Sequence, residues 1–287
     1  MESLSWYGTN HSTEIMLGKV LRLACIALLL GRGIQAIIGD LPLRTILWNQ
    51  LLLEPIVTGL FGVAWKDYVT SETLDFLINT VGSLVGLFFV IVGVWTGLNK
   101  ASDKLIPFLK ISSGILAAIF LLKFMEKSFY IGMLIEHGAQ FMAPLAYAWW
   151  LEDKNLLGRR LIMVKLCISA TFLGHALFAV GFHPVPGGFV DMIINVLGLS
   201  QEGAVEMLFV AGSIDIACAL FLFIPPLDRY ALTFMVAWGL ITASARVLAH
   251  VDIDHFWFTW HQWGVEMIYR LPHGLLPLAV FSIKRRL

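Results

Sequence analysis

The sequence predicts an all-α, polytopic integral membrane protein in which eight transmembrane helices form two parallel four-helix repeats. Three observations carry this prediction: the composition, the number of apolar stretches and a similarity between the two halves of the chain. Of the 287 residues, 58% are hydrophobic and 14% are charged, whereas a soluble domain averages about 25% charged residues. The chain is therefore too apolar for an ordinary soluble enzyme, and its predicted partner is the lipid bilayer.

Charge and cysteine content exclude other classes of protein. Twenty Lys and Arg residues balance twenty Asp and Glu residues, so the chain has no basic field that would attract nucleic acid. The cysteines Cys25, Cys167 and Cys218 lie in apolar runs without a CxxC spacing. This placement argues against a disulfide framework and against a thiol-relay enzyme.

The predicted spans follow from length, because a helix needs about 20 mostly apolar residues to cross a bilayer. Eight stretches meet this requirement: Leu17 to Gly39, Leu74 to Leu98, Leu105 to Phe124, Phe129 to Leu151, Leu161 to Gly181, Gly203 to Ile224, Arg229 to His250 and Gln262 to Ile283. The polar start MESLSWYGTNHSTE has neither the basic segment nor the cleavage site of a signal peptide. We therefore expect the first span to stay in the membrane.

A further apolar segment, Leu43 to Trp65, carries Glu54 and Pro55 at its middle. If this segment crossed the bilayer, every later lysine cluster would lie on the wrong side. We expect instead an interfacial or re-entrant helix on the outer face of the first repeat.

Lysine and arginine are concentrated on one side of the predicted spans, and this bias sets the orientation of a membrane protein. The rich side holds Lys19, Arg22, Lys100, Lys104, Lys110, Lys154, Arg159, Arg160, Lys165, Arg229, Lys284, Arg285 and Arg286. The opposite side holds Arg44, Lys66, Lys123 and Lys127. The bias predicts that both termini are cytoplasmic, and we expect the membrane to be a bacterial inner membrane.

Groups of residues recur in the same order in both halves of the chain, which indicates a duplication. The matched groups are Leu21-Arg22-Leu23 and Leu30-Gly31-Arg32 with Val164-Lys165-Leu166 and Leu173-Gly174-His175, Lys104 and Gly114 with Arg229 and Gly239, and Glu136, Gln140 and Pro144-Leu145 with Glu266, Arg270 and Pro277-Leu278. The predicted repeats are residues 1–152 and 160–287. Four spans return the chain to its starting side, so a pseudo-twofold axis along the membrane normal would relate the repeats.

The second repeat begins with a basic residue and the run Leu173-Gly174-His175, continues through His183-Pro184-Val185-Pro186-Gly187-Gly188-Phe189, and has a short amphipathic stretch that ends Leu197-Gly198-Leu199. This pattern resembles the DoxX-like family of small four-helix membrane proteins, and the first repeat resembles it more loosely. The resemblance covers nearly the whole chain. It implies a four-helix unit with quinone-linked redox chemistry, and it transfers no catalytic residue.

Polar side chains occur inside the predicted spans, where a charged group costs about 2.5–3.5 kcal/mol on insertion scales. These side chains are Arg32, Gln35, Glu136, His137, Gln140, His175, Asp215, Thr242, Arg246, His250, Glu266, Arg270 and His273. Odd-numbered spans run outward, so Arg32 lies roughly 22 Å from the cytoplasmic start of its span. The other ionisable groups fall mostly in the same outer half. We infer one or two polar chambers that open toward the outer face, one in each repeat.

The second repeat offers the stronger chamber because it adds two imidazoles. The predicted catalytic residues are His175, Arg246, Glu266, Arg270 and His273, and the predicted substrate-binding residues are Arg32, Gln35, Glu136 and Gln140. Ion pairs are expected between Glu266 and Arg246 or Arg270, and between Glu136 and Arg32. For any single residue, a purely structural ion pair is the alternative interpretation.

Two uses of the chamber involve redox chemistry. In the first, Arg246 or Arg270 donates a hydrogen bond to a quinone carbonyl, and His273 or Glu266 exchanges the accompanying proton. The protein would then be a quinone-linked oxidoreductase, or its membrane subunit, with a soluble or membrane redox partner. In the second, His175 and His273 ligate a b-type haem; without a CxxCH motif the haem would not be covalently attached.

Two other uses remain open. The outer connection that contains His250, Asp252, Asp254 and His255 offers imidazole and carboxylate ligands for zinc, copper or iron. The chain could also be a carrier or a membrane partner subunit without redox chemistry, since parallel repeats with central polar residues also describe transporters. The apolar inner half of the spans, however, offers no obvious path to the cytoplasm.

Overall fold

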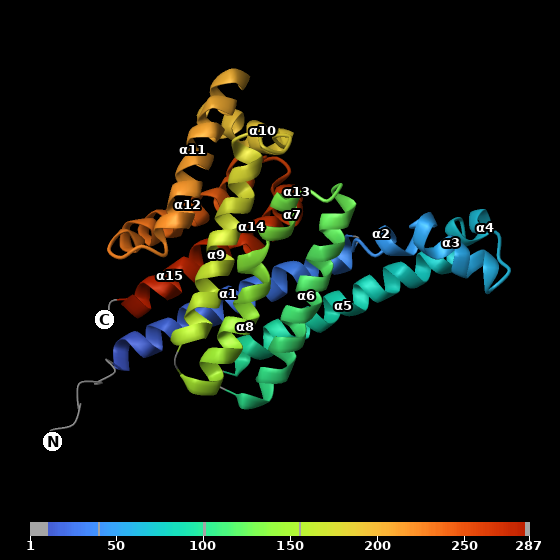
Figure 1. The fold of residues 1–287 in the computed structure, drawn as a ribbon, viewed down its shortest axis with the longest axis horizontal. Helices are drawn as coiled ribbons and strands as arrows, with labels where there is room; N and C mark the ends of the chain where they lie inside the picture. The colour runs from blue at the N-terminus through green and yellow to red at the C-terminus, as the bar shows by residue number, and fades with distance from the viewer. Residues whose placement is uncertain (1–10, 40, 100–101, 155, 285–287) are drawn as a thin grey trace.

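The computed structural model describes residues 11–39, 41–99, 102–154 and 156–284, and the described part of the chain consists of helices and their connections, without strands (Figure 1). The helices are α1 (His11–Ile38), α2 (Arg44–Leu47), α3 (Gln50–Gly59), α4 (Trp65–Val69), α5 (Glu72–Leu98), η1 (Asp103–Leu105), α6 (Ile106–Glu126), α7 (Ile131–Ile135), α8 (Gly138–Asp153), α9 (Gly158–Ala179), α10 (Gly187–Leu197), α11 (Gln201–Phe221), α12 (Leu227–Leu248), α13 (Phe256–Thr259), η2 (Trp260–Gly264), α14 (Val265–Arg270) and α15 (Pro272–Lys284). Lys100, Arg285 and Arg286, which contribute to the predicted orientation, and the first ten residues of the chain lie outside the described residues.

Within the described residues, six helices are long and apolar enough to cross a membrane. They are α1, α5, α6 together with η1, α9, α11 and α12. These six coincide with the first, second, third, fifth, sixth and seventh predicted spans. The prediction of a polytopic helical membrane protein is therefore confirmed at this level.

The fourth and eighth predicted spans are broken helices. The fourth is divided between α7 and α8, with Glu136 and His137 at the break. The eighth is divided into η2, α14 and α15, and Leu271 separates the last two. Pro272 explains the second break, because proline has no N–H to donate to the helical ladder. Both breaks lie among the intramembrane polar residues.

The segment predicted to be one interfacial helix forms three short helices, α2, α3 and α4, at the far right of Figure 1. The longest of them, α3, has ten residues, about half the length needed to cross a bilayer. Side chains cap α3 and the next long helix, α5. The Asn49 carboxamide oxygen accepts from Leu52 N at 3.2 Å at the start of α3, and the Ser71 hydroxyl oxygen accepts from Leu74 N at 3.3 Å at the start of α5. Leu51 is 91% exposed, as expected for a helix that contacts lipid.

The helices pack in a pattern that recurs in the two halves of the chain. In the first half, α1 packs on α5 and α6 packs on α8; in the second, α9 packs on α11 and α12 packs on α15. The first long helix of each half also packs on the broken helix of the other half, α1 on α14 and α15, and α9 on α7 and α8. The first long helix of each half is therefore partly covered by the broken helix of the other half.

Individual contacts follow the same pattern. The Arg22 guanidinium donates to the carbonyl of Thr96 at 2.8 Å, and the Lys165 ammonium donates to the carbonyl of Leu222 at 3.2 Å. Both bonds join the first long helix of one half to the C-terminal end of the next long helix.

Two glycines allow the halves to approach each other closely. A Cβ atom at Gly31 would lie 2.9 Å from the backbone nitrogen of Tyr269, and one at Gly174 would lie 2.5 Å from the backbone nitrogen of Glu136. Such distances exclude any side chain without movement of the backbone. The two contacts are reciprocal, because each glycine lies on the first helix of one half and touches the broken helix of the other.

Candidate functional site

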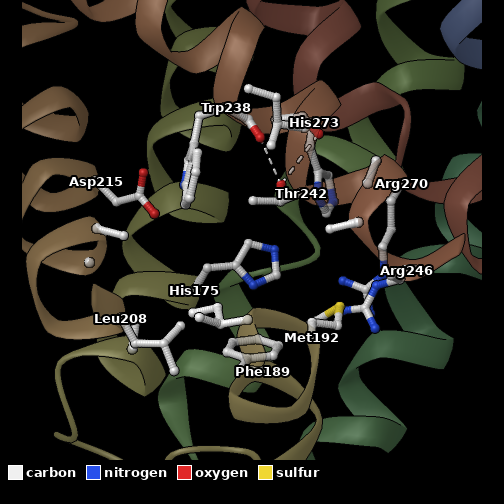
Figure 2. Close-up of a pocket in the computed structure, with 18 of the residues that line it drawn as sticks. His175, Phe189, Met192, Leu208, Asp215, Trp238, Thr242, Arg246, Arg270 and His273 are labelled. Carbon is white, nitrogen blue, oxygen red and sulfur yellow. Dashed lines mark hydrogen bonds between the residues drawn. The ribbon is translucent and has the colours of Figure 1, made fainter. Parts of the chain in front are cut away.

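A cavity of about 240 Å³ lies within the second half of the chain, enclosed by α9, α10, α11, α12 and the junction of α14 with α15 (Figure 2). Most of its wall is apolar. The amphipathic helix α10 contributes Phe189, Met192, Ile193, Val196 and Leu197, and α11 contributes Met207, Leu208, Ala211 and Gly212. The cavity is slightly smaller than the roughly 300–1,000 Å³ of typical small-molecule sites.

Four of the five predicted catalytic residues line this cavity. His175 from α9, Arg246 from α12, Arg270 from α14 and His273 from α15 reach it from four different helices (Figure 2). The break between α14 and α15 places Arg270 and His273 on two short helices, each of which directs a side chain toward the cavity. The structure therefore brings these four residues together at one cavity.

Glu266, the fifth predicted catalytic residue, is paired with Arg246. Its carboxylate lies 3.1 Å from the guanidinium, and the two side chains are 28% and 11% exposed. Of the two partners that the sequence offered, Arg246 or Arg270, the structure selects Arg246. Glu266 does not line the cavity and serves to hold Arg246 in place.

Arg270 differs from Arg246 because it makes no ion pair among the described residues. Its guanidinium lies beside that of Arg246 at one side of the cavity (Figure 2). The Nε atoms of both arginines are buried and have no hydrogen-bond partner within the described part of the chain. This side of the cavity thus carries hydrogen-bond donors without acceptors.

The two histidines connect the cavity to the first half of the chain. His175 Nδ1 lies 3.2 Å from the Glu136 carboxylate, and the rings of His175 and His273 are 5.2 Å apart between centroids. His273 Nε2 is 3.3 Å from the amide nitrogen of Gln140. Behind them, the Arg32 guanidinium donates to the Gln140 carboxamide oxygen at 2.5 and 2.9 Å.

The expected ion pair between Glu136 and Arg32 is not formed in the structure. Arg32 instead donates to Gln140 and, at 2.6 Å, to Gln35, and its guanidinium stacks 3.8 Å from the centroid of the Tyr269 ring. The Glu136 carboxylate instead lies 3.2 Å from His175 Nδ1 and 3.7 Å from His137 Nε2. The two groups therefore have other partners.

The predicted substrate-binding residues Arg32, Gln35, Glu136 and Gln140 do not line the cavity. Arg32, Glu136 and Gln140 are buried, and each is bound to another polar side chain. Glu136 and Gln140 contact His175 and His273 on the side away from the cavity, and Arg32 holds Gln140.

The opposite side of the cavity contains residues that the sequence prediction did not assign to the site. Asp215 is 5% exposed, and its Oδ1 atom has no hydrogen-bond partner in the described part of the chain. It faces the indole of Trp238, and Thr242 lies one helical turn further along α12 (Figure 2). For Trp238 and Thr242 the sequence did contain a signal: with Arg246 they follow one another at four-residue steps, which places them on one face of the helix.

Helix α10 was also missed as part of the site. Its sequence shows an amphipathic stretch, but one too short to cross the membrane. The helix begins after Pro186, ends at Gly198 with a positive φ of 68°, and is held to the end of α12 by a hydrogen bond of 3.1 Å from Asn195 to the Ala249 carbonyl. It forms the outer wall of the cavity.

The haem interpretation does not fit the geometry of the two histidines. A macrocycle ligated from both sides must lie between the two imidazoles. The rings of His175 and His273 are in direct contact at a centroid distance of 5.2 Å, which leaves no room for a porphyrin. Each ring also faces a polar group of the first half of the chain, Glu136 or Gln140.

The four predicted metal ligands are not gathered into one set. His250 stacks on Trp263 with ring centroids 3.6 Å apart, and its Nδ1 is 2.8 Å from the Arg246 carbonyl. The Asp252 carboxylate accepts hydrogen bonds from Asp254 N and from the His255 ring, which holds the pKa of Asp252 below its usual value. Among the described residues no group of three or more His, Cys, Asp or Glu is arranged to hold a metal ion.

The fold and the site together define a polytopic α-helical membrane protein with an amphipathic cavity between its helices. Comparison with protein-family models, curated proteins and solved structures gives no match to this chain.

Proposed function

We propose that the chain crosses the membrane eight times as a tandem duplication of a DoxX-like four-helix unit, with both termini in the cytoplasm of a bacterial cell. In this proposal α7 with α8, and η2 with α14 and α15, form the fourth and eighth spans. Broken helices are tolerated at membrane depth where they are covered by protein or line a cavity.

Reciprocal contacts support the duplication. Alignment of Gly31 with Gly174 pairs Arg32 with His175, and alignment of Pro144 with Pro277 pairs Gln140 with His273. The contact between Arg32 and Gln140 then corresponds to that between His175 and His273. The same alignment pairs Glu136 with Tyr269, which replaces the match with Glu266 suggested by the sequence.

The proposed function is to bind and handle a quinone or similar lipid-soluble molecule in the cavity of the second half. A single observation carries this proposal: polar side chains from four helices, His175, Arg246, Arg270 and His273, line a mostly apolar cavity within the predicted membrane region. Such a wall suits a molecule with an oxygen-bearing ring and an apolar tail. The ligand would reach the cavity from the lipid beside α10.

The residues of the cavity divide between binding and proton exchange. Arg270 is the donor available to a carbonyl oxygen, because Arg246 is occupied by Glu266. His175, backed by the Glu136 carboxylate at 3.2 Å, is the group suited to give or take a proton, since a carboxylate partner orients an imidazole and stabilises its charged form. The Gln140 amide nitrogen, 3.3 Å from His273 Nε2, orients the second ring but, as a donor, does not stabilise its charged form.

The duplication also explains why the first half would not bind a second molecule at the equivalent place. A Cβ atom at Gly86 would meet the Gly33 carbonyl as one at Gly212 would meet the Ala176 carbonyl, and counted from this pair Phe89 corresponds to Asp215. Phe89 is 1% exposed and belongs to the apolar core. An apolar ring thus occupies the position of Asp215 in the first half.

Equilibrium binding of a short-chain naphthoquinone to the purified protein tests this function. Titration in a non-ionic detergent, followed by tryptophan fluorescence, should show saturable quenching, because Trp238 lies in the wall. The variant R270Q should weaken binding about tenfold or more, as expected for loss of a hydrogen bond from a charged group. The control is R229Q, because Arg229 is an exposed arginine of the second half that does not line the cavity. Absence of saturable binding, or equal binding by R270Q, would contradict the proposal.

A further inference from the structure

The cavity to which the proposed function is assigned has more positive than negative side chains on one side. Arg246 and Arg270 lie there, and Arg32 lies behind the wall, where its guanidinium contacts the same Tyr269 ring as that of Arg270. The carboxylates within this group are Glu136 and Glu266, and Glu136 is bound by His175 at 3.2 Å. Glu266 is bound by Arg246 at 3.1 Å. One guanidinium, that of Arg270, is thus left without a carboxylate of its own.

A cation without a partner is costly in this position. The site lies between helices of membrane length, where charged groups are normally paired or reach water. Arg32 meets this requirement through Gln35, Gln140 and the face of Tyr269. The guanidinium carbon of Arg270 lies 5.6 Å from the Tyr269 ring centroid, and its Nε atom has no hydrogen-bond partner among the described residues.

The cavity is also polarised along its length. Arg246 and Arg270 lie on one side, and Asp215 lies on the other, beyond His175 and Trp238 (Figure 2). A negatively charged head group would be attracted to the arginines, whereas the buried Asp215 side chain offers it no cation. Its apolar part would lie against Met192, Leu208 and the rest of the apolar wall. The wall therefore favours one orientation of the ligand.

From this arrangement we infer that the ligand of the cavity is an acidic amphiphile, whose head is an oxyanion bound by Arg270, beside the ion pair of Arg246 and Glu266, and whose tail is a hydrocarbon. The inference rests on the proposed function and narrows its ligand class. Arginine is suited to this role because its planar guanidinium binds carboxylate and phosphate oxygens through paired hydrogen bonds. An ionised hydroxyl on a quinone ring, a carboxylate and a phosphate share this chemistry.

Two matched pairs of compounds test the inference by isothermal titration calorimetry in a non-ionic detergent, with protein-free micelles as the blank. The first pair is a 3-alkyl-2-hydroxy-1,4-naphthoquinone, ionised at pH 7, and the same 3-alkyl compound without the hydroxyl. The second pair is dodecanoate and dodecanol. The ionised member of each pair should bind at least tenfold more tightly, as a charge-assisted hydrogen bond implies.

Variants of Arg270 assign the preference to the cavity. R270Q should abolish the difference within both pairs, R270K should keep most of it, and the exposed control R229Q should leave it unchanged. If R270Q does not fold, the wild-type pairs and R270K still decide the question.

The outcomes separate the inference from the proposed function. Equal binding of both naphthoquinones, with no binding of dodecanoate, would overturn the inference and leave quinone binding intact. Tight binding of dodecanoate without binding of either naphthoquinone would overturn the quinone proposal and support the inference. Failure of all four compounds to bind would overturn both.

Discussion

Gln140 and His273 meet at the interface between the two halves of the chain, with the amide nitrogen of one 3.3 Å from Nε2 of the other. The Gln140 carboxamide oxygen accepts two bonds from Arg32, so its amide group is turned toward the histidine. An amide donates, and the ring nitrogen must therefore accept, which makes His273 a neutral imidazole. A structural residue of the first half thus sets the state of a cavity residue in the second.

Replacement of Gln140 by leucine should destabilise the protein strongly. The variant Q140L removes the acceptor of a buried arginine, and an uncompensated buried charge costs about 3–5 kcal/mol. Q35L, which removes the other acceptor at the half-buried end of the same guanidinium, should cost about 1 kcal/mol. Thermal unfolding of both variants in one detergent measures the difference. A loss for Q140L no greater than that for Q35L would show that the bridge between the halves is not needed.

The reciprocal glycines should respond alike. G31A and G174A each place a methyl group against the backbone of the other half, and such overpacking costs about 1–3 kcal/mol. G114A is the matched control, since no atom lies within 4 Å of a Cβ at that helical position, and alanine there should be neutral or stabilising by up to about 1 kcal/mol. Thermal midpoints of the three variants test the prediction, which fails if G31A or G174A is as stable as G114A.

The ion pair between Arg246 and Glu266 should show strong coupling. R246Q or E266Q alone leaves a half-buried charge without its partner, whereas the double variant leaves none. We expect the double variant to be more stable than the sum of the two single losses implies, by about 1–3 kcal/mol. The exposed pair of Lys110 and Glu152 is the control, and its coupling should be below about 1 kcal/mol. Additive losses at Arg246 and Glu266 would contradict a coupled pair.

Accessibility to a membrane-impermeant thiol reagent tests the proposed orientation. In a variant without the three native cysteines, D254C should be labelled in intact cells, because the loop between α12 and α13 would face outward. L157C, between α8 and α9, should be labelled only after the membrane is opened. The reverse pattern would invert the topology, and labelling of both positions in intact cells would contradict an odd number of crossings between them.

The sequence predicted the membrane class and the polar side of the cavity because both depend on residue type and spacing. Eight apolar stretches are visible by length, and polar residues within them are conspicuous. The stripe that includes Trp238, Thr242 and Arg246 follows helical periodicity, so its common direction could be foreseen. His175, Arg270 and His273 could be assigned to the same layer from their depth.

Partner choice could not be read from the sequence. The pairing of Glu136 with His175, in place of Arg32, depends on the way α9 crosses α7 and α8, which is fixed by the close approach at Gly174. The breaks in the fourth and eighth spans separate residues that a straight helix would place on one face. Likewise, the role of α10 depends on tertiary packing, since a short amphipathic helix can lie on a membrane as readily as over a cavity.

Photolabelling is the most direct test of the central claim that one amphipathic cavity in the second half binds the ligand. A naphthoquinone with a photoreactive alkyl tail would be irradiated with the purified protein, and the modified peptides identified by mass spectrometry. The account predicts labels on α10 and α11, at residues such as Met192 and Met207, which excess unlabelled naphthoquinone removes. Labels confined to the first half, or spread over lipid-facing residues of all helices and unaffected by competition, would contradict it.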